Sequence, residues 1–367
     1  MQVTWVDSID CIPRELFNTL VPLGNPSMRW EWLKVLEETA KRTHQAWKPQ
    51  HAMVWNDQKL IAAAVFWWRE DSWGDFVFDQ EIAFLAKKLG FSWYPKLVGT
   101  VPFTAAMGWR ILHRESPEGW QAMANILDAA LGLAATQRSS LNLLWLEPSW
   151  ISQPRVQAEL RQRQGFFWPH PHFWWERGNL KNYEDFLSHL NKNDRRNARR
   201  ELNSAQQHGL EIVIQKASES PREWHRTMAA LYQKTNDQFG YYAARFLDNE
   251  FFEQAALTAG DWVWYVAALS PQKSTPMAMS FFVSDEVHWI GRYWGEESFY
   301  KNLHFQLCYH EPLRYILNGT GRSFDPGMGS PHKLQRGFWP YTAMSWHWVS
   351  NRQLNEILRR SFEKIYS

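Results

Sequence analysis

The segment FDPGMGSPHKLQRGF, residues 324–338, gathers more potential chemistry than any other window of this sequence. It places an acid, a histidine, a lysine and an arginine among three glycines, and glycines let the backbone approach a bound donor closely. The candidate site residues of this loop are Asp325, Gly327, Gly329, His332, Lys333 and Arg336.

The side chains of this loop suit the transfer of a group to an amine. Such a reaction needs an uncharged amine, a polarised carbonyl and a proton for the leaving group, which two or three polar side chains can supply. His332 could deprotonate the ammonium, because its unperturbed pKa is about 6.5. Asp325 could orient a histidine or bind the ammonium, and Lys333 and Arg336 could hold a phosphate or carboxylate of the donor. The alternative is a surface loop in which glycine and proline merely turn the chain.

The strand-like run GRYWG, residues 291–295, supplies two more candidates. Arg292 and Tyr293 alternate, so only one of them can face a cleft if the strand is regular. We expect Arg292 to face it and bind the donor, because burying an arginine otherwise requires a paired acid. Tyr293 is kept as a candidate for the acceptor side.

A helix is expected over residues 303–317, LHFQLCYHEPLRYIL, and it carries two further catalytic candidates. His304 lies at its start, where it would cap or pack as readily as react. Tyr309 lies one helical turn beyond Phe305, and its phenol could protonate a leaving group or simply pack.

Residues 191–209, NKNDRRNARRELNSAQQHG, indicate a basic helix between the two halves of the chain. A cap at Asn193 or Asp194 predicts a single helix over 193–208. Spacings of three, four, seven and eight residues place five cations on one face. That face could bind the phosphates of a donor, or it could be a solvated surface with partners such as Glu201. Its cations are Lys192, Arg195, Arg196, Arg199 and Arg200.

Two acids in the first half could bind the acceptor. Asp75 and Asp79 flank an apolar triplet, and on a strand both would point to one face and attract a cation such as a lysine or ornithine side chain. Two exposed turn acids are the alternative. His170 and His172 also lie close together, but they lack a third ligand nearby, so no metal site is expected.

The totals of the chain limit its class. A length of 367 residues suits two domains. With 40 Lys and Arg against 38 Asp and Glu, no charge excess points to DNA. Two cysteines cannot make a disulfide framework, and the start lacks the pattern of a signal peptide, so we expect a cytoplasmic protein. No apolar run reaches the roughly 20 residues of a transmembrane segment.

Aromatic residues make up 16% of the chain, including 24 Trp. Such residues bury large apolar areas, and they also line cavities for long hydrophobic ligands. The excess therefore indicates either a thick core or the wall of an acyl-chain tunnel.

Hydrophobic periodicity gives the same order of elements in both halves: a helix, an antiparallel run of strands, then a helix and a strand. This order is that of the acetyltransferase-like (GNAT) pattern. It predicts an α/β protein with mixed sheets of the α+β type and two tandem GNAT-like domains, 1–165 and 166–367, separated where prolines interrupt residues 148–178. The expected helices cover 28–43, 119–137, 223–239, 248–257 and 303–317, and the expected strands cover 52–55, 60–68, 141–145, 262–269, 277–284, 287–294 and the residues from 323.

Five ordered motifs carry a likeness to a known family: SWGDFVFD (72–79), WYPKLVGTVPFTAAMG (93–108), GRYWG, LHFQLCYH and FDPGMGSPHKLQRGF. From about Trp30 to Trp348 the chain resembles the FemAB-like group of GNAT-fold proteins, often labelled peptidoglycan biosynthesis or recognition proteins. The resemblance implies a tandem GNAT fold and an N-acyltransferase activity, in which an amine attacks an activated acyl carbonyl. Better-known relatives take the acyl group from aminoacyl-tRNA, whereas other GNAT-fold enzymes use acyl-CoA or an acyl carrier protein.

The chain departs from the usual GNAT pattern where the donor's pyrophosphate would bind. Residues 296–303 read EESFYKNL, without the arginine- and glycine-rich loop whose amides cradle a pyrophosphate. Residues 107–110 in the first half match no better, so we expect one half to be structural or to bind the acceptor. This departure argues against acetyl-CoA as the donor.

Three functions remain open on this basis. The first is an N-acyltransferase that moves a fatty acyl group from an acyl carrier protein or CoA thioester to an amino group of an amino acid or peptide, with no tightly bound cofactor. The second is an aminoacyl-tRNA-dependent transferase that grips tRNA with the basic helix, although the near-neutral net charge weighs against extensive tRNA contact. The third is a non-catalytic peptide- or glycan-binding module, against which the polar loop argues.

Overall fold

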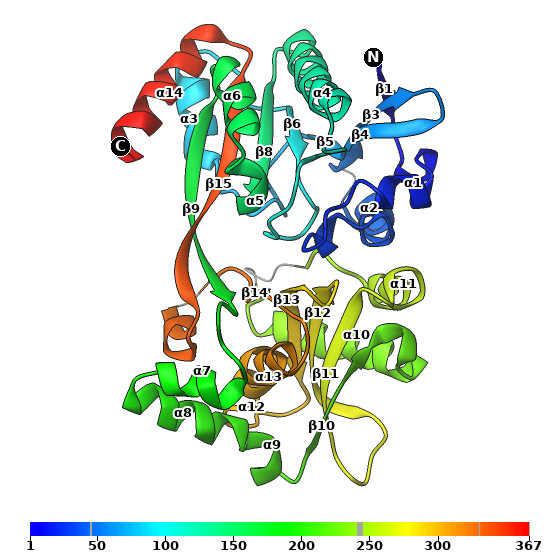
Figure 1. Cartoon of the computed structure of the whole chain (residues 1–367), viewed down its shortest axis with the longest axis vertical. Coiled ribbons are helices and arrows are strands. Elements are labelled where there is room, and N and C mark those ends of the chain that lie inside the picture. Colours follow the sequence, from blue (N-terminus) through cyan, green and yellow to red (C-terminus); the bar gives the residue numbers. More distant parts are fainter. Residues whose placement is uncertain (45, 241–244, 330, 367) are drawn as a thin grey trace. The chain divides into compact units, whose positions relative to one another are not determined.

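The computed structural model describes residues 1–44, 46–240, 245–329 and 331–366. Ser330 of the candidate loop lies outside them. The chain forms two compact units, shown in Figure 1: unit 1 contains Met1–Pro171 and Thr342–Ser367, and unit 2 contains His172–Tyr341. Unit 2 therefore begins close to the expected boundary at residue 166.

The end of the chain differs from the expected organisation, because it belongs to unit 1. Strand β15 (Trp339–Val349) pairs antiparallel with β8 (Ser140–Leu146) through its last residues. Helix α14 (Arg352–Tyr366), red in Figure 1, follows β15 and packs Leu354 and Leu358 into a core cluster of unit 1. Unit 1 is thus made of two segments that are distant in sequence.

Unit 1 is built on two sheets. The first has the strand order β1-β3-β4-β7 and is antiparallel, and the second has the order β15-β8-β6-β5-β2 with β6 and β8 parallel. Its other strands are β1 (Val3–Val6), β2 (Lys48–Pro49), β3 (His51–Asn56), β4 (Lys59–Ala64), β5 (Phe66–Arg69), β6 (Lys96–Gly99) and β7 (Ile111–His113). Its other helices are α1 (Arg14–Asn18), α2 (Trp30–Thr43), α3 (Gln80–Lys88), α4 (Pro117–Thr136), α5 (Pro148–Ile151) and α6 (Pro154–Gln162).

Helix α4 confirms the helix expected over 119–137 and shows how the local sequence sets it. Ser116 caps its start by accepting the N–H of Gly119 at 3.1 Å, and Pro117 suits the first turn because its missing N–H is not needed there. Strands β3 and β4 pair antiparallel and agree with the strands expected over 52–55 and from residue 60. The single strand expected over 60–68 is instead two strands, β4 and β5, which are separated at Val65 and belong to different sheets. Residues 60–67 are all buried, so the sequence has no polar residue at the point where one strand ends and the next begins.

Unit 2 contains a single mixed run of strands in the order β10-β11-β12-β13-β14-β9. The pairs from β10 to β13 are antiparallel, and β13 and β14 are parallel. The strands are β9 (Phe166–Glu176), which belongs to unit 2 from His172 onward, β10 (Glu211–Lys216), β11 (Val263–Leu269), β12 (Pro276–Ser284), β13 (His288–Glu296) and β14 (Ser323–Asp325). The helices are α7 (Tyr183–His189), α8 (Lys192–Leu202), α9 (Ser204–Gln207), α10 (Arg222–Asp237), α11 (Asn249–Ala259), α12 (Leu303–Phe305) and α13 (Glu311–Asn318). These bounds confirm the strands and helices expected between residues 223 and 323.

The stretch 148–178 is more ordered than expected, because its prolines fit regular structure. Pro148 and Pro154 begin α5 and α6, where a proline costs no hydrogen bond. Pro169 and Pro171 lie inside β9, the strand along which the chain passes from unit 1 to unit 2. In the described part of the chain, no helix is long and apolar enough to cross a membrane.

The basic stretch forms two helices rather than the single one expected over 193–208. Asn191 caps α8 by accepting the N–H groups of Asn193 and Asp194. Helix α8 ends at Leu202, and α9 begins at Ser204 after Asn203. The helix is interrupted here because the N–H of Ala205 donates to the Gln306 side chain at 2.8 Å.

Candidate functional site

The loop after β14 is the centre of the candidate site in unit 2. Strand β14 ends at Asp325, and the chain turns through Gly327 (φ 79°) and Gly329 (φ 113°) into a 3₁₀ helix over Pro331–Arg336. A Cβ atom at Gly327 would lie 3.3 Å from the carbonyl oxygen of Gly291, so the loop runs close against β13. Both positive φ angles favour glycine, which explains the composition of this bend.

Asp325 orients a histidine, but this histidine is His172 of β9 rather than one in its own loop. His172 Nε2 lies 2.9 Å from Asp325 Oδ1, and both side chains are fully buried. The same oxygen accepts the N–H of Gly327 at 2.8 Å. Burial raises the pKa of Asp325, but the interaction with His172 outweighs burial and the pKa is lowered. The pair therefore ties β9 to the start of the loop.

Lys333 is buried and holds the loop from within. Its Nζ donates to the carbonyl oxygens of Gly327 and Met328, each at 2.7 Å, and lies 5.6 Å from the ring centre of Phe173. Burial lowers the pKa of Lys333 to about 8, against the opposing effect of the Asp325 carboxylate. The expected contact with a donor phosphate would compete with these two carbonyls.

His332 and Tyr309, two of the predicted site residues, come together in unit 2. His332 Nε2 and the Tyr309 hydroxyl lie 3.1 Å apart. Tyr309 belongs to a π-helical turn, Gln306–His310, and such turns are frequent at functional sites. Burial and the charges of Arg336 and Lys333 lower the pKa of His332, so its imidazole is neutral at pH 7. Burial raises the pKa of Tyr309, so its phenol keeps its proton.

His304 lies beside this pair in an aromatic environment. Its ring centre is 5.2 Å from that of Trp294, 5.7 Å from that of Tyr309 and 6.3 Å from that of His332. Burial, with the neighbouring His332 and Arg336, lowers its pKa to about 4. His304 is therefore neutral at pH 7 and packs the pair from the helix α12 side.

Arg336 is engaged by a partner within unit 2. Its Nε and Nη2 atoms donate to the two oxygens of Glu201 at 2.9 and 2.6 Å, and its Nη1 donates to the carbonyl of His332 at 2.7 Å. Glu201, considered above as a partner for surface cations, is buried on the inner side of α8. His310 Nε2 lies 2.8 Å from the same carboxylate, and Tyr183 contacts the other nitrogen of His310 at 2.8 Å.

Arg292 and Tyr293 do not alternate as expected, because β13 contains a bulge. Phe281 pairs with Tyr293 whereas Phe282 pairs with Gly291, so Arg292 is the extra residue. Tyr293 lies 5.3 Å from Phe281, ring centre to ring centre, and packs with other aromatic side chains of unit 2. The other aromatic side chains that pack against Tyr293 are Tyr232, Phe251 and Phe252. For these residues the contacts favour a packed core over the wall of an acyl-chain tunnel.

The basic face of α8 is largely open to solvent. Lys192, Arg196, Arg199 and Arg200 are exposed, and Arg199 pairs with the equally exposed Glu184 at 3.2 Å. Arg195 is half-buried and donates to the carbonyl of Leu190. The outer face of this helix thus carries cations, while its inner face carries Glu201.

These motifs and this fold agree with a family match over nearly the whole chain. The family model described as peptidoglycan biosynthesis/recognition, FemAB-like, matches residues 8–366. The chain belongs to the FemAB-like family. No curated protein matches it. Membership supports an acyltransferase-type role in peptidoglycan biosynthesis.

Solved structures share the fold of this FemAB-like chain. FemX is similar with a TM-score of 0.58 and 11% identity, over 98% of this chain and 100% of FemX. L-PGS from Bacillus licheniformis has a TM-score of 0.55 and 10% identity, over 95% of this chain and 96% of that one. The C-terminal domain of a putative lysylphosphatidylglycerol synthetase from Agrobacterium fabrum has a TM-score of 0.55 and 8% identity, over 95% and 94%. The fold of the chain is the tandem GNAT-like α/β fold.

Asp75 and Asp79 lie in unit 1, on a loop and at the start of α3 rather than on a strand. They nevertheless converge, because Lys96 of β6 donates to both, at 2.8 and 2.6 Å, and all three side chains are buried. Phe76 has a φ of 59°, so the segment turns between the two acids instead of running straight. Burial raises the pKa of Asp75 to about 6 despite the charge of Lys96. An internal ammonium thus occupies the position foreseen for an acceptor cation.

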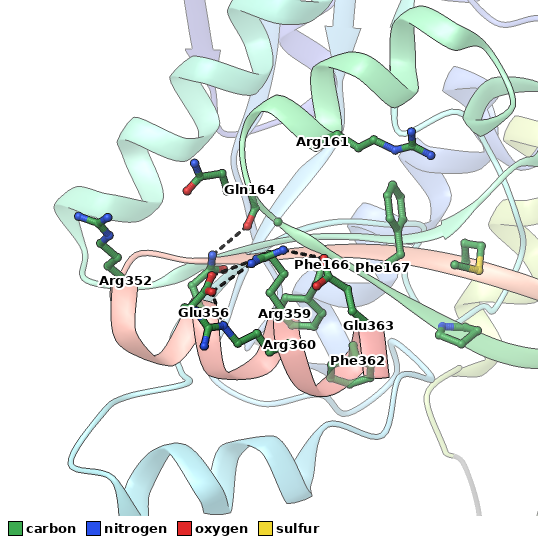
Figure 2. Close-up of a pocket in the computed structure, with 14 residues that line it drawn as sticks. Arg161, Gln164, Phe166, Phe167, Arg352, Glu356, Arg359, Arg360, Phe362 and Glu363 are labelled. Atoms are coloured by element: carbon green, nitrogen blue, oxygen red, sulfur yellow. Dashed lines mark hydrogen bonds and ion pairs between the residues drawn. The ribbon is translucent and has the colours of Figure 1, made fainter. Parts of the chain in front are cut away.

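A hollow of about 940 Å³ opens in unit 1 beside α14 (Figure 2). Figure 2 shows Glu356 joined by dashed lines to Arg359 and Arg360, whose nitrogens lie 3.0 and 2.5 Å from it. Phe166 and Phe362 stack nearby with ring centres 4.9 Å apart. The residues that line this hollow include none of the predicted site residues. Among the described residues, no group of three or more His, Cys, Asp or Glu is arranged to hold a metal ion.

Sequence reasoning did not foresee the pairings that hold the predicted residues, although it named His172 and Glu201 in other roles. Four buried residues make these pairings. Lys96 pairs with Asp79, His172 pairs with Asp325, and His310 pairs with Glu201. His310 lies within the motif LHFQLCYH, but the motif does not say which carboxylate it meets. Only the tertiary contacts, over separations of 17 to 153 residues, reveal these pairs.

Replacing Lys96 by Met should destabilise unit 1 strongly. Two carboxylates would remain buried without their cation, and breaking a buried pair in this way costs about 3–5 kcal/mol. Chemical denaturation followed by Trp fluorescence measures the loss. The control is Lys48→Met, which removes an exposed pair with Glu70 and should cost at most about 1 kcal/mol. Equal small effects of both substitutions would contradict the importance of the cluster.

Replacing Asp325 by Ala should lower the melting temperature, because His172 and the N–H of Gly327 lose their buried acceptor. The loss should be about 1–3 kcal/mol. The lowered pKa of Asp325 means that its contribution is present above the ordinary carboxyl pKa of about 3.9 and is lost as pH falls below that value. Thermal unfolding from pH 7 to pH 3 checks this, with exposed Glu286→Ala as the control. An unchanged melting temperature at pH 7 would exclude a structural role.

Proposed function

We propose that this FemAB-like protein is an N-acyltransferase that moves an acyl group, a fatty acyl group in our preferred version, from a thioester to an amino group. The observation that carries the proposal is the contact of 3.1 Å between His332 and Tyr309. It joins a neutral base to a protonated phenol at the end of a glycine-rich loop. These are the two groups that aminolysis requires besides a polarised carbonyl.

The proposed step balances with these two side chains. The substrate ammonium gives a proton to the His332 imidazole, and the free amine attacks the acyl carbonyl carbon to form the new C–N bond. The C–S bond breaks, and the departing thiolate takes a proton from Tyr309. The nitrogen of the new amide releases its second proton to solvent, and a proton returned from His332 to Tyr309 through their hydrogen bond restores both groups.

Donor binding is proposed for the outer face of α8 and for Arg292. Arg336 and Lys333 are engaged by Glu201 and by loop carbonyls, so they serve the loop in place of the phosphate role predicted for them. The exposed cations of α8 suit the phosphate of CoA or the acidic surface of an acyl carrier protein. An amino acid or peptide amine, such as that of lysine or ornithine, is the proposed acceptor.

A second candidate is transfer from aminoacyl-tRNA, because the exposed cations of α8 would also suit an RNA backbone. Incubation of the protein with a panel of donors, amino acids and a cell extract, followed by mass spectrometry, tests both candidates. Acylation that needs a thioester supports the first, and aminoacylation that ribonuclease abolishes supports the second. A folded protein that binds peptides or glycans and transfers nothing would overturn both.

Replacing His332 by Ala should lower kcat by about 10²–10⁴-fold, the usual contribution of a general base. In the unmodified protein kcat should rise with pH with a midpoint below about 6.5, because the pKa of His332 is lowered and the base form persists at lower pH. The variant should lose this rise. His189→Ala, at an exposed surface position, is the control. A retained pH profile in His332→Ala would remove His332 from the reaction.

Reversing two charges with Arg196→Glu and Arg199→Glu should raise KM for the donor and reduce its salt dependence. The physical reason is that exposed charges attract a polyanion through a field that salt screens over about 10 Å at 0.1 M. Arg222→Glu with Arg226→Glu on α10 makes the same charge change elsewhere in unit 2. Equal effects of both pairs would show a general charge effect and would remove α8 from donor binding.

A further inference from the structure

Glu201 occupies an unusual place on helix α8. The helix is almost entirely charged or polar, yet the Glu201 side chain is only 4% exposed. A buried carboxylate is costly unless charged partners and hydrogen bonds compensate it. The carboxylate of Glu201 has two such partners, Arg336 and His310.

The first partner of Glu201 is Arg336, and it fixes the loop. The guanidinium meets the carboxylate through two nitrogens, at 2.9 and 2.6 Å, which is the bidentate geometry that restricts both groups. It also lies 3.5 Å from the ring centre of Phe305. Its remaining nitrogen, Nη1, donates to the carbonyl oxygen of His332 at 2.7 Å. The backbone of His332 is thus held by a guanidinium that cannot turn freely.

The second partner of Glu201 is His310, and it fixes the π-helical turn. His310 Nε2 lies 2.8 Å from the carboxylate, and its Nδ1 lies 2.8 Å from the Tyr183 hydroxyl of α7. His310 directly follows Tyr309 in the chain. One carboxylate therefore anchors both members of the proposed catalytic pair, Tyr309 through His310 and His332 through Arg336.

We infer that Glu201 is a positioning residue for the His332–Tyr309 pair, holding the two segments that carry it in register through Arg336 and His310. The effect of Glu201 on catalysis rests on the proposed function, whereas its contacts with Arg336 and His310 do not depend on that proposal. The ionisable groups that face His332 are His304 from α12, Tyr309 from the π-helical turn, Lys333 and Arg336 from its own 3₁₀ helix, and Glu201 from α8.

A double-mutant cycle distinguishes positioning from simple neutralisation of charge. If Glu201 acts through Arg336, then Glu201→Gln and Arg336→Gln should each lower kcat by roughly 10- to 100-fold, as expected for a misplaced catalytic group. The double variant should be no worse than either single variant, because the two residues act as a unit. KM for both substrates should stay within about twofold of the unmodified protein. Glu250→Gln, which removes an exposed carboxylate of α11 that is hydrogen-bonded to Gln254, is the matched control and should change nothing.

A second readout needs no activity. The imidazole resonances of His332 are followed by NMR in the full chain, with and without Tyr309→Phe. In the unmodified protein this change should shift them, because the hydrogen bond at 3.1 Å is lost. In Glu201→Gln the same change should have little effect, because the two groups are already apart. An equal shift in both backgrounds would overturn the inference.

The two readouts also separate the inference from the proposed function. A lost NMR response in Glu201→Gln without detectable acyl transfer by the unmodified protein would sustain the positioning role and overturn the transferase. If Glu201→Gln fails to fold, Glu201→Asp replaces it, since the shorter acid keeps the charge and cannot reach both partners. Unmoved His332 resonances and an unchanged kcat in a folded Glu201→Asp would overturn the positioning role.

Discussion

A buried carboxylate on the inner side of α8 is the constraint on which the candidate site depends. Glu201 has bonds to one cation and one imidazole, and these belong to segments more than a hundred residues further along the chain. Removing it from water is compensated only while both contacts are kept, so folding of unit 2 and assembly of the pair cannot be separated. Burial of this acid also leaves the outer face of α8 to its exposed cations.

Unit 1 meets the same electrostatic problem with the signs reversed. Lys96 is the buried cation there, and Asp75 and Asp79 surround it where strands β5 and β6 meet α3. The two acids respond differently to burial: the pKa of Asp75 is raised, whereas additional donors from Ser72 and Tyr94 help to lower that of Asp79. Such a cluster specifies one arrangement of the loop. Lys96 therefore already takes the place of the acceptor cation that Asp75 and Asp79 were predicted to bind.

The elements of this fold were largely predictable, because their signals are local. The hydrophobic pattern of residues 119–137, the alternation of the strands and the ordered motifs suffice to predict α4, the sheet of unit 2 and the family. The site was predictable only by residue type: His332 and Tyr309 do meet, whereas the partners of Asp325 and Arg336 lie far away in sequence. The bulge at Arg292 and the helix break at Asn203 were not predicted, because both depend on contacts with residues distant in sequence.

The return of the chain to unit 1 has a consequence for the order of folding during synthesis. Unit 2 is one continuous stretch, His172–Tyr341, and all of it is made before β15 is complete. Unit 1 lacks the strand beside β8 until then, and the apolar surface of its core stays uncovered for the time needed to translate unit 2. Domains fold as units when their sequence is available. Unit 2, although translated after most of unit 1, therefore completes its fold first. A chain that ends at Tyr341 would leave the core of unit 1 exposed and prone to aggregation.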